Sequence, residues 1–354
     1  MIKCKPNKIE WLTIEKQYVM IPALEEKTMG TKEQLLMLFE NNKGVFFSGE
    51  DIAEKLSISR TAVWKSVQSL RSEGYSIEAV RNKGYCLSVE TDILSVQGIQ
   101  KYLQPVCANV ELSVFPALHS TNALAREKAM TGVPDGYTIL ANSQTGGRGR
   151  RGRTFYSPPD TGVYLSMVLR PPHYSSQQAV RLTTMAAVAA CEAIEAVSGE
   201  KAQIKWVNDI YVRGKKVCGI LTEASFGLED GFLEYAVLGI GINVFPPADG
   251  FPDEIKDIAG TVFRKAQNDG KNQLAAEFLN RFMRYYAMPQ ESDYVDNYRS
   301  RSMVIGKEIQ VIFSDCTKKA TALDVDKDCR LILEYEDGRI ESLYSGEISI
   351  KVSC

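Results

Sequence analysis

A stretch of glycines and arginines carries the clearest chemical signal in this sequence. Residues 144–153 read Gln-Thr-Gly-Gly-Arg-Gly-Arg-Arg-Gly-Arg, directly after an apolar run at 137–141 that predicts a strand. Glycine lets a backbone approach a ligand closely, and arginine binds carboxylate or phosphate through planar, bidentate contacts. We therefore expect this loop to bind an anion such as phosphate.

The same loop also matches a dinucleotide-binding pattern, which has to be weighed. Residues 147–152 spell G-x-G-x-x-G, but that fingerprint needs a helix starting within the motif and an acidic residue about 20 positions on. Here Pro158 and Pro159 follow, a second strand is predicted at 163–169, and position 172 is proline. These residues argue against a Rossmann site. The other alternative is a solvated basic loop or one that contacts nucleic acid, but glycines packed among the arginines favour a buried ligand.

A second group of polar residues lies inside a strand-like segment at 203–212. Lys205, Asn208 and Asp209 interrupt its apolar residues, and polar groups on buried strands are costly unless they are paired or functional. A lysine there can stabilise negative charge that develops on a phosphate. Asn208 and Asp209 are candidates to bind a divalent cation beside the phosphates. Alternating glycines in the strand predicted at 236–244 leave room either for a ligand or for close packing of a helix.

Several other chemistries are absent from the sequence. It has two histidines, no H-E-x-x-H, no cysteine spacing typical of zinc, no G-x-x-x-x-G-K-[ST] and no G-x-S-x-G. These absences exclude a P-loop nucleotidase and predict no structural metal. What remains is a site rich in positive charge that stabilises phosphate with little acid–base chemistry.

Length and composition set the class of protein. The 354 residues are too many for one ordinary domain, and 44% hydrophobic with 24% charged residues is typical of globular proteins. A net charge of −2 means that any contact with nucleic acid must be local. Eight scattered cysteines without a C-x-x-C pair indicate reduced thiols, and no run of 18 apolar residues occurs. We expect a soluble, cytoplasmic protein with no membrane partner.

The N-terminal part predicts a winged helix-turn-helix. Helical spacing begins at Thr31, a second short helix covers 48–56, and a third runs from Arg60 to Arg71 after a tight turn. Strands at 75–80 and 84–87 enclose a basic wing tip. Side chains that suit phosphates and base edges make up the candidate DNA-binding set: Ser59, Arg60, Thr61, Trp64, Lys65, Gln68, Arg81 and Lys83. The alternative is a three-helix packing module without a DNA partner.

The rest of the chain predicts a mixed α+β organisation. A helix should begin at the cap 120–122, an apolar core helix covers 179–197, and a loop covers 245–252. After residue 306, short strands at 308–312, 320–325, 331–335 and 348–350, with a hairpin turn at Asp337-Gly338, predict a small β-barrel of about 50 residues. We expect an extension at 1–28, without regular structure, then domains at 29–90, 91–300 and 301–354.

Five motifs in order resemble those of the biotin protein ligases. They are Gly147–Arg153 (GRGRRGR), Lys205–Asp209 (KWVND), Lys216-x-x-Gly219-Ile220-Leu221-x-Glu223, Gly239–Asn243 (GIGIN) and, at the helix cap, Ser120-Thr121-Asn122, with Gln144 in addition. With the winged helix, the stretch from Thr31 to Lys351 resembles the bifunctional members that are also repressors. The resemblance implies a class II synthetase-like central domain and an SH3-like C-terminal barrel.

The resemblance also implies a two-step reaction and roles for individual residues. Biotin and Mg-ATP would give biotinyl-5′-AMP, from which biotin passes to a lysine of a biotin carboxyl carrier protein. Arg150 and Lys205 would be the catalytic cations. The residues implied in binding biotin and the adenylate are Ser120, Thr121, Asn122, Gln144, Gly147, Arg148, Gly149, Arg150, Lys205, Gly219, Gly241 and Asn243.

The same resemblance implies regulation. Bound biotinyl-AMP would favour a homodimer that binds a two-fold operator DNA. Two residues depart from the family pattern: Val207 stands where proline is usual and Phe155 where tryptophan is frequent. Neither change removes a charge. A biotin sensor without ligase activity and a lipoate or octanoate ligase are the competing interpretations, and the arginine-rich loop with the winged helix favours the biotin ligase.

Overall fold

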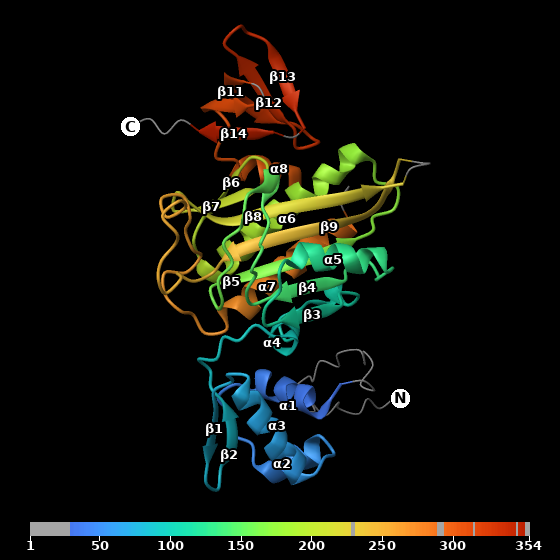
Figure 1. Ribbon diagram of the computed structural model, residues 1–354, viewed down its shortest axis with the longest axis vertical. Coiled ribbons are helices and arrows are strands. Elements are labelled where there is room, and N and C mark those ends of the chain that lie inside the picture. Colours follow the sequence, from blue (N-terminus) through green and yellow to red (C-terminus); the bar gives the residue numbers. More distant parts are fainter. Residues whose placement is uncertain (1–28, 228–230, 289–293, 314–315, 345, 351–354) are drawn as a thin grey trace, which may run out of the picture.

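The computed structural model describes residues 29–350, apart from 228–230, 289–293, 314–315 and 345. Three groups of elements follow one another along the long axis of the molecule (Figure 1). The extension predicted at 1–28 lies outside the described residues. No helix within the described ranges has both the length and the apolar content needed to cross a lipid bilayer.

The first group is the predicted winged helix-turn-helix. It consists of α1 (Thr31–Glu40), α2 (Gly49–Lys55) and α3 (Arg60–Ser72), followed by the antiparallel wing strands β1 (Ile77–Val80) and β2 (Gly84–Leu87). Ser48 and Ser59 cap α2 and α3 by accepting hydrogen bonds from backbone N–H groups at the third helical position. The group buries an apolar core of its own.

The second group is built on a seven-stranded sheet. Its strands are β3 (Leu112–Phe115), β4 (Thr138–Ala141), β5 (Gly162–Leu169), β6 (Ala202–Lys205), β7 (Asp209–Val212), β8 (Lys215–Phe226) and β9 (Leu233–Asn243). Its helices are α4 (Val96–Gln100), α5 (Thr121–Met130), α6 (Ser176–Ser198), α7 (Gly270–Ala287) and α8 (Tyr294–Arg301), with single 3-10 turns at Pro105–Cys107 and Arg150–Gly152. The strand order is β3-β4-β5-β9-β8-β7-β6, and β3–β4 is the parallel pair.

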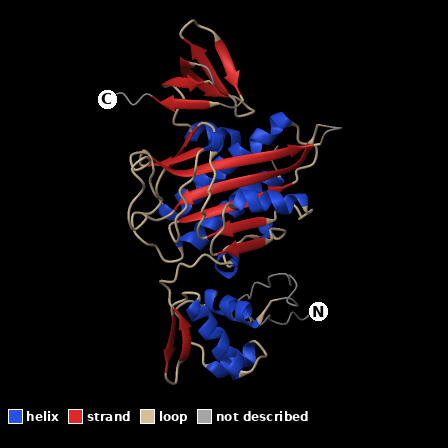
Figure 2. Ribbon diagram, viewed as in Figure 1, coloured by secondary structure: helices blue, strands red, loops and turns tan. Residues whose placement is uncertain are grey.

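Helices cover both faces of this sheet (Figure 2). On one face α5 packs against Ile139, Val168 and Val237, whereas α6 and α7 cover the opposite face, where Met167 and Leu238 are buried. Strand β5 is therefore buried along its whole length, which explains why its sequence is mostly apolar, with Ser166 as a buried polar residue.

The strand-like segment at 203–212 differs from the prediction. It forms two antiparallel strands, β6 and β7, joined by a turn at 206–208, so Lys205 pairs with Asp209 across the first step of a hairpin. The polar residues that interrupt the apolar pattern are thus at strand ends and in a turn. No continuous strand exists there, so these polar groups do not pay the free-energy cost of burial inside a strand.

The third group is a five-stranded antiparallel sheet. Its strands are β10 (Glu308–Ile312), β11 (Thr317–Val325), β12 (Leu331–Tyr335), β13 (Ile340–Leu343) and β14 (Glu347–Ile350), in the order β13-β12-β11-β10-β14. The turn at Asp337-Gly338 joins β12 to β13, a strand that the sequence did not reveal because it has apolar residues only at its two ends. Trp206 donates its indole N–H to the Cys329 carbonyl at 3.1 Å, so this sheet packs against the β6–β7 turn.

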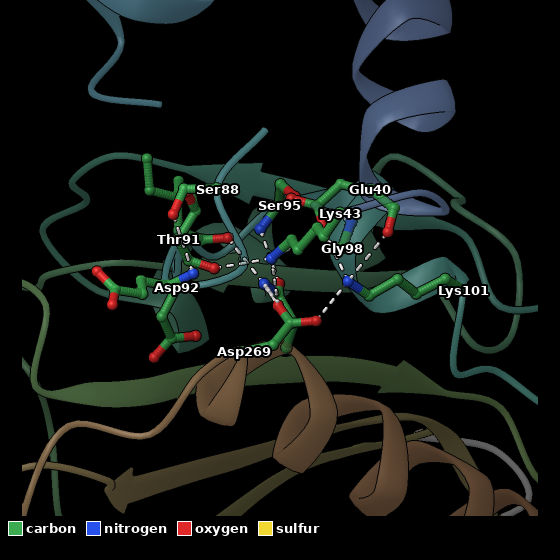
Figure 3. Close-up of polar contacts among 12 residues, drawn as sticks. Glu40, Lys43, Ser88, Thr91, Asp92, Ser95, Gly98, Lys101 and Asp269 are labelled. Carbon is green, nitrogen blue, oxygen red and sulfur yellow. Dashed lines mark hydrogen bonds and ion pairs between the residues drawn. The ribbon is translucent and has the colours of Figure 1, made fainter. Parts of the chain in front are cut away.

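A nearly buried group of four charged side chains joins the first group to the second (Figure 3). Glu40 ends α1 and Lys43 follows it, whereas Lys101 follows α4 and Asp269 precedes α7. Lys43 Nζ lies 3.2 Å from Glu40 and 3.0 Å from Asp269, and Lys101 Nζ lies 2.7 Å from Glu40 and also pairs with Asp269. None of the four side chains is more than 10% exposed. We call this group the charged joint.

Candidate active site

One cavity lined by the inner strands β8 and β9 of the central sheet brings together most of the residues predicted for the site. The loop before α5, the glycine-arginine loop, the β6–β7 turn and strands β8 and β9 all line it. The predicted residues in its lining are Ser120, Thr121, Asn122, Gln144, Arg148, Gly149, Arg150, Lys205, Asn208, Asp209, Gly219 and Gly241. Segments separated by about a hundred residues along the chain thus contribute to one binding space.

The glycine-arginine loop places Arg150 inside this cavity. Phe155 N donates to Gly147 O at 2.9 Å and Gly149 N donates to Arg153 O at 2.7 Å, which folds the loop back on itself. The Arg150 guanidinium donates to Asn208 Oδ1 at 3.0 Å. Burial lowers the pKa of Arg150, while the charge of Asp209 acts in the opposite direction. The loop therefore presents a partly desolvated cation to a ligand.

The second cation comes from the end of β6. Burial lowers the pKa of Lys205, an effect that Asp209 opposes and Lys216 adds to. Lys216 Nζ lies 2.7 Å from Asp209 Oδ1. A cavity with two half-buried cations, and a third paired with its carboxylate, favours an anionic ligand because the low dielectric strengthens each attraction.

The other end of the cavity is neutral and polar. Gln144 Oε1 accepts from the Thr121 backbone N–H at 2.8 Å and lies 3.1 Å from its hydroxyl, and Gln144 Nε2 donates to Ser157 Oγ at 3.1 Å. Ser120 accepts from Ala123 N and caps α5, the role that helix start signals predict. The first turn of α5 is thereby fixed against the strand-to-loop connection that carries Gln144.

The strand glycines make room for two side chains of the protein. A Cβ on Gly239 would lie 2.0 Å from Asn122 Oδ1, and one on Gly241 would lie 2.6 Å from the Phe155 ring. Phe155 also covers Gly219, where a Cβ would lie 3.3 Å from the ring. The alternation in β9 therefore accommodates an amide and an aromatic ring that line the cavity.

Two predicted residues do not line this cavity. Asn243 donates to the Gly260 carbonyl at 3.1 Å and holds the loop that follows β9. Gly147 lies within the glycine-arginine loop, where a Cβ would lie 2.5 Å from the Phe155 carbonyl. Gly147 therefore packs against Phe155, which lines the cavity, whereas Asn243 supports a loop outside its lining.

The third group also contributes to the cavity, and no sequence pattern had indicated this. Glu347 of β14 lines the cavity, accepts from Arg151 Nη1 at 3.0 Å and also pairs with Arg153. Burial opposes ionisation of Glu347, but the hydrogen bond and charge of Arg153, with Arg151, outweigh it and lower the pKa of the carboxyl. A lone glutamate near the end of a chain carries no sequence signal that links it to a loop about two hundred residues away.

The candidates for a metal site have protein partners in this structure. Asn208 Oδ1 accepts from Arg150, and Asp209 pairs with Lys216. Among the residues that the structure describes, no cluster of three or more His, Cys, Asp or Glu could hold a metal ion. A magnesium ion carried by a nucleotide needs only one or two carboxylates, because phosphate oxygens and water complete its octahedron. Asp209 can supply one, so the residues fit a nucleotide-borne ion better than a permanent metal site.

The predicted DNA-binding residues form an exposed set on α3, its cap and the wing tip. All eight side chains are exposed, and Trp64 is 54% exposed despite its large apolar ring. Ser59 accepts a hydrogen bond from Ala62 N and therefore also serves the helix cap. The apolar side of α3, with Val63, Val67 and Leu70, faces the core, which leaves the polar side open to a partner.

Known proteins match this chain along almost its whole length. Residues 31–86 match the HTH domain model, 114–243 the biotin/lipoate A/B protein ligase family and 304–351 the biotin protein ligase C terminal domain. The bifunctional ligase/repressor BirA of Bacillus spizizenii is 35% identical over 90% of this chain and 98% of its own length, and that of Escherichia coli is 28% identical over 90% and 96%. The structure of the biotin protein ligase from Aquifex aeolicus in complex with biotin and ATP is 26% identical, with a TM-score of 0.57 over 68% of this chain and 98% of that one.

The fold and the cavity define a ligand-binding α+β protein with a helix-turn-helix domain at its N-terminal end. The chain belongs to the biotin protein ligase family, and the relatives that it matches over 90% of its length carry the name bifunctional ligase/repressor.

Proposed function

We propose that this chain is an ATP-dependent biotin protein ligase that also represses transcription in response to biotin. It forms biotinyl-5′-AMP and pyrophosphate from biotin and ATP, and then transfers biotin to a lysine of a carrier protein. The observation that carries the enzymatic part is that Arg150 and Lys205 line one cavity whose far end is neutral and polar. Relatives of known name and full-length similarity support both roles.

The two cations account for the first step. A biotin carboxylate oxygen attacks the α-phosphorus of ATP, a new P–O bond forms, and pyrophosphate leaves as the bond to the bridging oxygen breaks. Two anions must approach each other for this, and Arg150 and Lys205 offset their repulsion in a site of low dielectric. Asn208 keeps the Arg150 guanidinium in place. A nucleotide-bound Mg²⁺ would neutralise phosphate charge, with Asp209 as its protein ligand.

The second step needs the carrier to reach the cavity. The unprotonated amine of the carrier lysine attacks the acyl carbon, the C–N bond forms, and AMP leaves with the acyl-phosphate oxygen while the amine loses a proton. Shielding the mixed anhydride from water falls to the glycine-arginine loop and the loop after β9. We assign catalysis to residues 91–300 and support of the arginine loop to residues 301–354.

Incubation with biotin, ATP, Mg²⁺ and a biotin carboxyl carrier domain, followed by streptavidin blotting, tests the ligase. Labelling of the carrier that depends on ATP is the expected result. Binding of biotin without labelling would instead indicate a sensor, and labelling with lipoate or octanoate in place of biotin would indicate the related ligases.

The repressor role is assigned to residues 29–90. The carrying observation is the exposed polar face of α3 with the basic wing tip, residues Arg60, Lys65, Arg81 and Lys83 among them. Adenylate binding favours a homodimer that presents two α3 helices to a two-fold operator. Sedimentation with and without biotin plus ATP tests this: an unchanged monomer fraction would refute ligand-linked dimerisation. The unpaired state of the described cysteines suits the reducing cytoplasm predicted from the sequence.

A further inference from the structure

The neutral end of the cavity contains an amide whose orientation is fixed from both sides. Asn122 lies over Gly239, in a row where Ser166 of β5, Gly239 of β9 and Leu221 of β8 are register partners. Its Nδ2 donates to Glu223 Oε2 at 2.9 Å and lies 3.4 Å from the Leu221 carbonyl. Because both of these groups only accept, the nitrogen must face them and the Asn122 oxygen must face Ser166.

The fixed amide determines where the neighbouring hydroxyl protons go. Ser166, fully buried, has its Oγ 2.6 Å from Asn122 Oδ1 and 2.8 Å from Thr121 Oγ1. An amide oxygen cannot donate, so the single Ser166 proton is used on Asn122. The 2.8 Å contact between the two hydroxyl oxygens then takes the Thr121 proton, which leaves Gln144 Oε1 accepting from the Thr121 backbone N–H and free to accept once more. Thr121 therefore offers the cavity lone pairs and no proton.

Glu223 is the group that starts this sequence of hydrogen bonds. Its other oxygen accepts from Arg126 Nη1 at 3.0 Å, so both carboxylate oxygens have donors and neither can act as one. If position 223 could donate, Asn122 could turn its oxygen toward it. The Asn122 nitrogen would then donate to Ser166, and Ser166 would donate to Thr121, which would use up acceptor capacity at the cavity wall.

We propose that Glu223 is a positioning residue that makes the neutral end of the cavity an acceptor for the N–H groups of the biotin ureido ring. The inference rests on the proposed function, because it assumes that the biotin carboxylate faces Arg150 and Lys205. The ureido ring then lies at the opposite end. Its two N–H groups need acceptors, which Thr121 Oγ1 and Gln144 Oε1 provide. Glu223 itself acts only through Asn122 and Ser166.

The test measures biotin-dependent pyrophosphate release by the full-length protein with three ligands. These are biotin and the two cyclic carbamates in which one or the other ureido N–H is replaced by oxygen at nearly the same size. Wild type should reject at least one carbamate by about 100-fold in kcat/KM, since an acceptor-lined site faces a lone pair there. Glu223→Gln should raise KM for biotin about tenfold with kcat little changed, and should shrink the discrimination about tenfold.

The matched control is Arg126→Gln, which leaves Glu223 and its bond to Asn122 in place and should change discrimination by less than about twofold. A structural role for Glu223 would weaken biotin and carbamates equally, and that result, or no change at all, would overturn the inference. If Glu223→Gln does not fold, as judged by thermal unfolding, Ser166→Ala removes the relay one step later and should show the same loss of discrimination. Absence of biotin-dependent pyrophosphate release by wild type would refute the proposed function instead.

Discussion

The Arg150 guanidinium donates a hydrogen bond to Asn208 Oδ1 at 3.0 Å, across 58 residues of sequence. Arg150 belongs to the glycine-arginine loop and Asn208 to the β6–β7 turn, so this bond connects the two motifs that carry most of the positive charge of the site. Asn208 in turn donates to the Ile220 carbonyl at 2.9 Å, which ties both to the sheet. The arginine loop is therefore anchored where it enters the cavity.

Replacing Lys205 should impair chemistry more than binding. We expect Lys205→Gln to lower the rate of biotin-dependent pyrophosphate release by about 100-fold or more, because a preorganised cation is lost from a low-dielectric site. The measurement is the initial rate at saturating biotin and ATP. Lys201→Gln, at an exposed lysine just before β6, is the control. A similar drop in rate in the two variants would show that Lys205 has no specific role in catalysis.

Glu347→Gln should loosen the arginine loop without unfolding the protein. The pairs with Arg151 and Arg153 are half-exposed, so we expect global stability to change by less than about 1 kcal/mol. Trypsin should nevertheless cleave the loop several-fold faster, as measured by mass spectrometry of early fragments. Because the pKa of Glu347 is lowered on folding, wild type should keep this protection at mildly acidic pH and lose it only as pH falls through the shifted pKa. Glu336→Gln, on an exposed turn, should leave cleavage unchanged.

The charged joint should be sensitive to loss of a single charge. Lys43→Met leaves Glu40 and Asp269 with only Lys101 between them, and an uncompensated buried charge costs about 3–5 kcal/mol. Denaturant unfolding should report the loss, and proteolysis at 88–95 should report freedom of the winged helix.

Two comparisons make this prediction specific. The double variant Lys43→Met with Asp269→Asn restores neutrality and should lose less than the sum of the two single variants. Lys32→Met removes an exposed pair with Glu73, 2.8 Å apart, and should cost less than about 1 kcal/mol. An equal loss of stability in Lys43→Met and Lys32→Met would contradict the view that the charged joint is buried.

Asp92 should make stability depend on pH in an unusual direction. Burial raises its pKa from the ordinary 3.8 to about 7, only partly offset by Lys271. A carboxyl group with a higher pKa in the folded than in the unfolded chain takes up a proton on folding, so its contribution to stability falls as pH rises from about 4 to about 7. Asp92→Asn should therefore gain stability relative to wild type across that range. Unfolding midpoints at several pH values measure this, and a constant difference would disprove the shift.

Local sequence signals predicted the elements well where local physics decides them. The helix cap at 120–122, the helix-turn-helix spacing and the Asp337-Gly338 turn each depend on residues close in sequence. The segment at 203–212 was predicted wrongly as one strand. Its apolar residues continue through the turn, because Trp206 packs against the C-terminal sheet and Val207 is buried as well. Apolar residues buried in the turn therefore gave the segment the sequence pattern of a single strand.

The site was harder to predict where it depends on distant contacts. Resemblance to known motifs identified residues that the structure brings to one cavity, but not the part that each plays there. Asn243 supports a loop, Phe155 fills the space above two strand glycines, and Glu347 arrives from a separate sheet. Such contacts follow from how sheets and loops pack in three dimensions, which spacing along the chain does not encode.

The charged joint bears on which spacing of operator half-sites the protein would recognise. The charged joint attaches α1 directly to the elements next to α4 and α7. In a homodimer, the distance between the two α3 helices would therefore be fixed by the packed domains and not by a flexible linker. Such a dimer would bind only operators whose half-sites have the matching spacing. Inserting a single base pair between the two half-sites rotates one of them by about a tenth of a turn away from its α3 helix. The charged joint would then determine which operators the protein can bind.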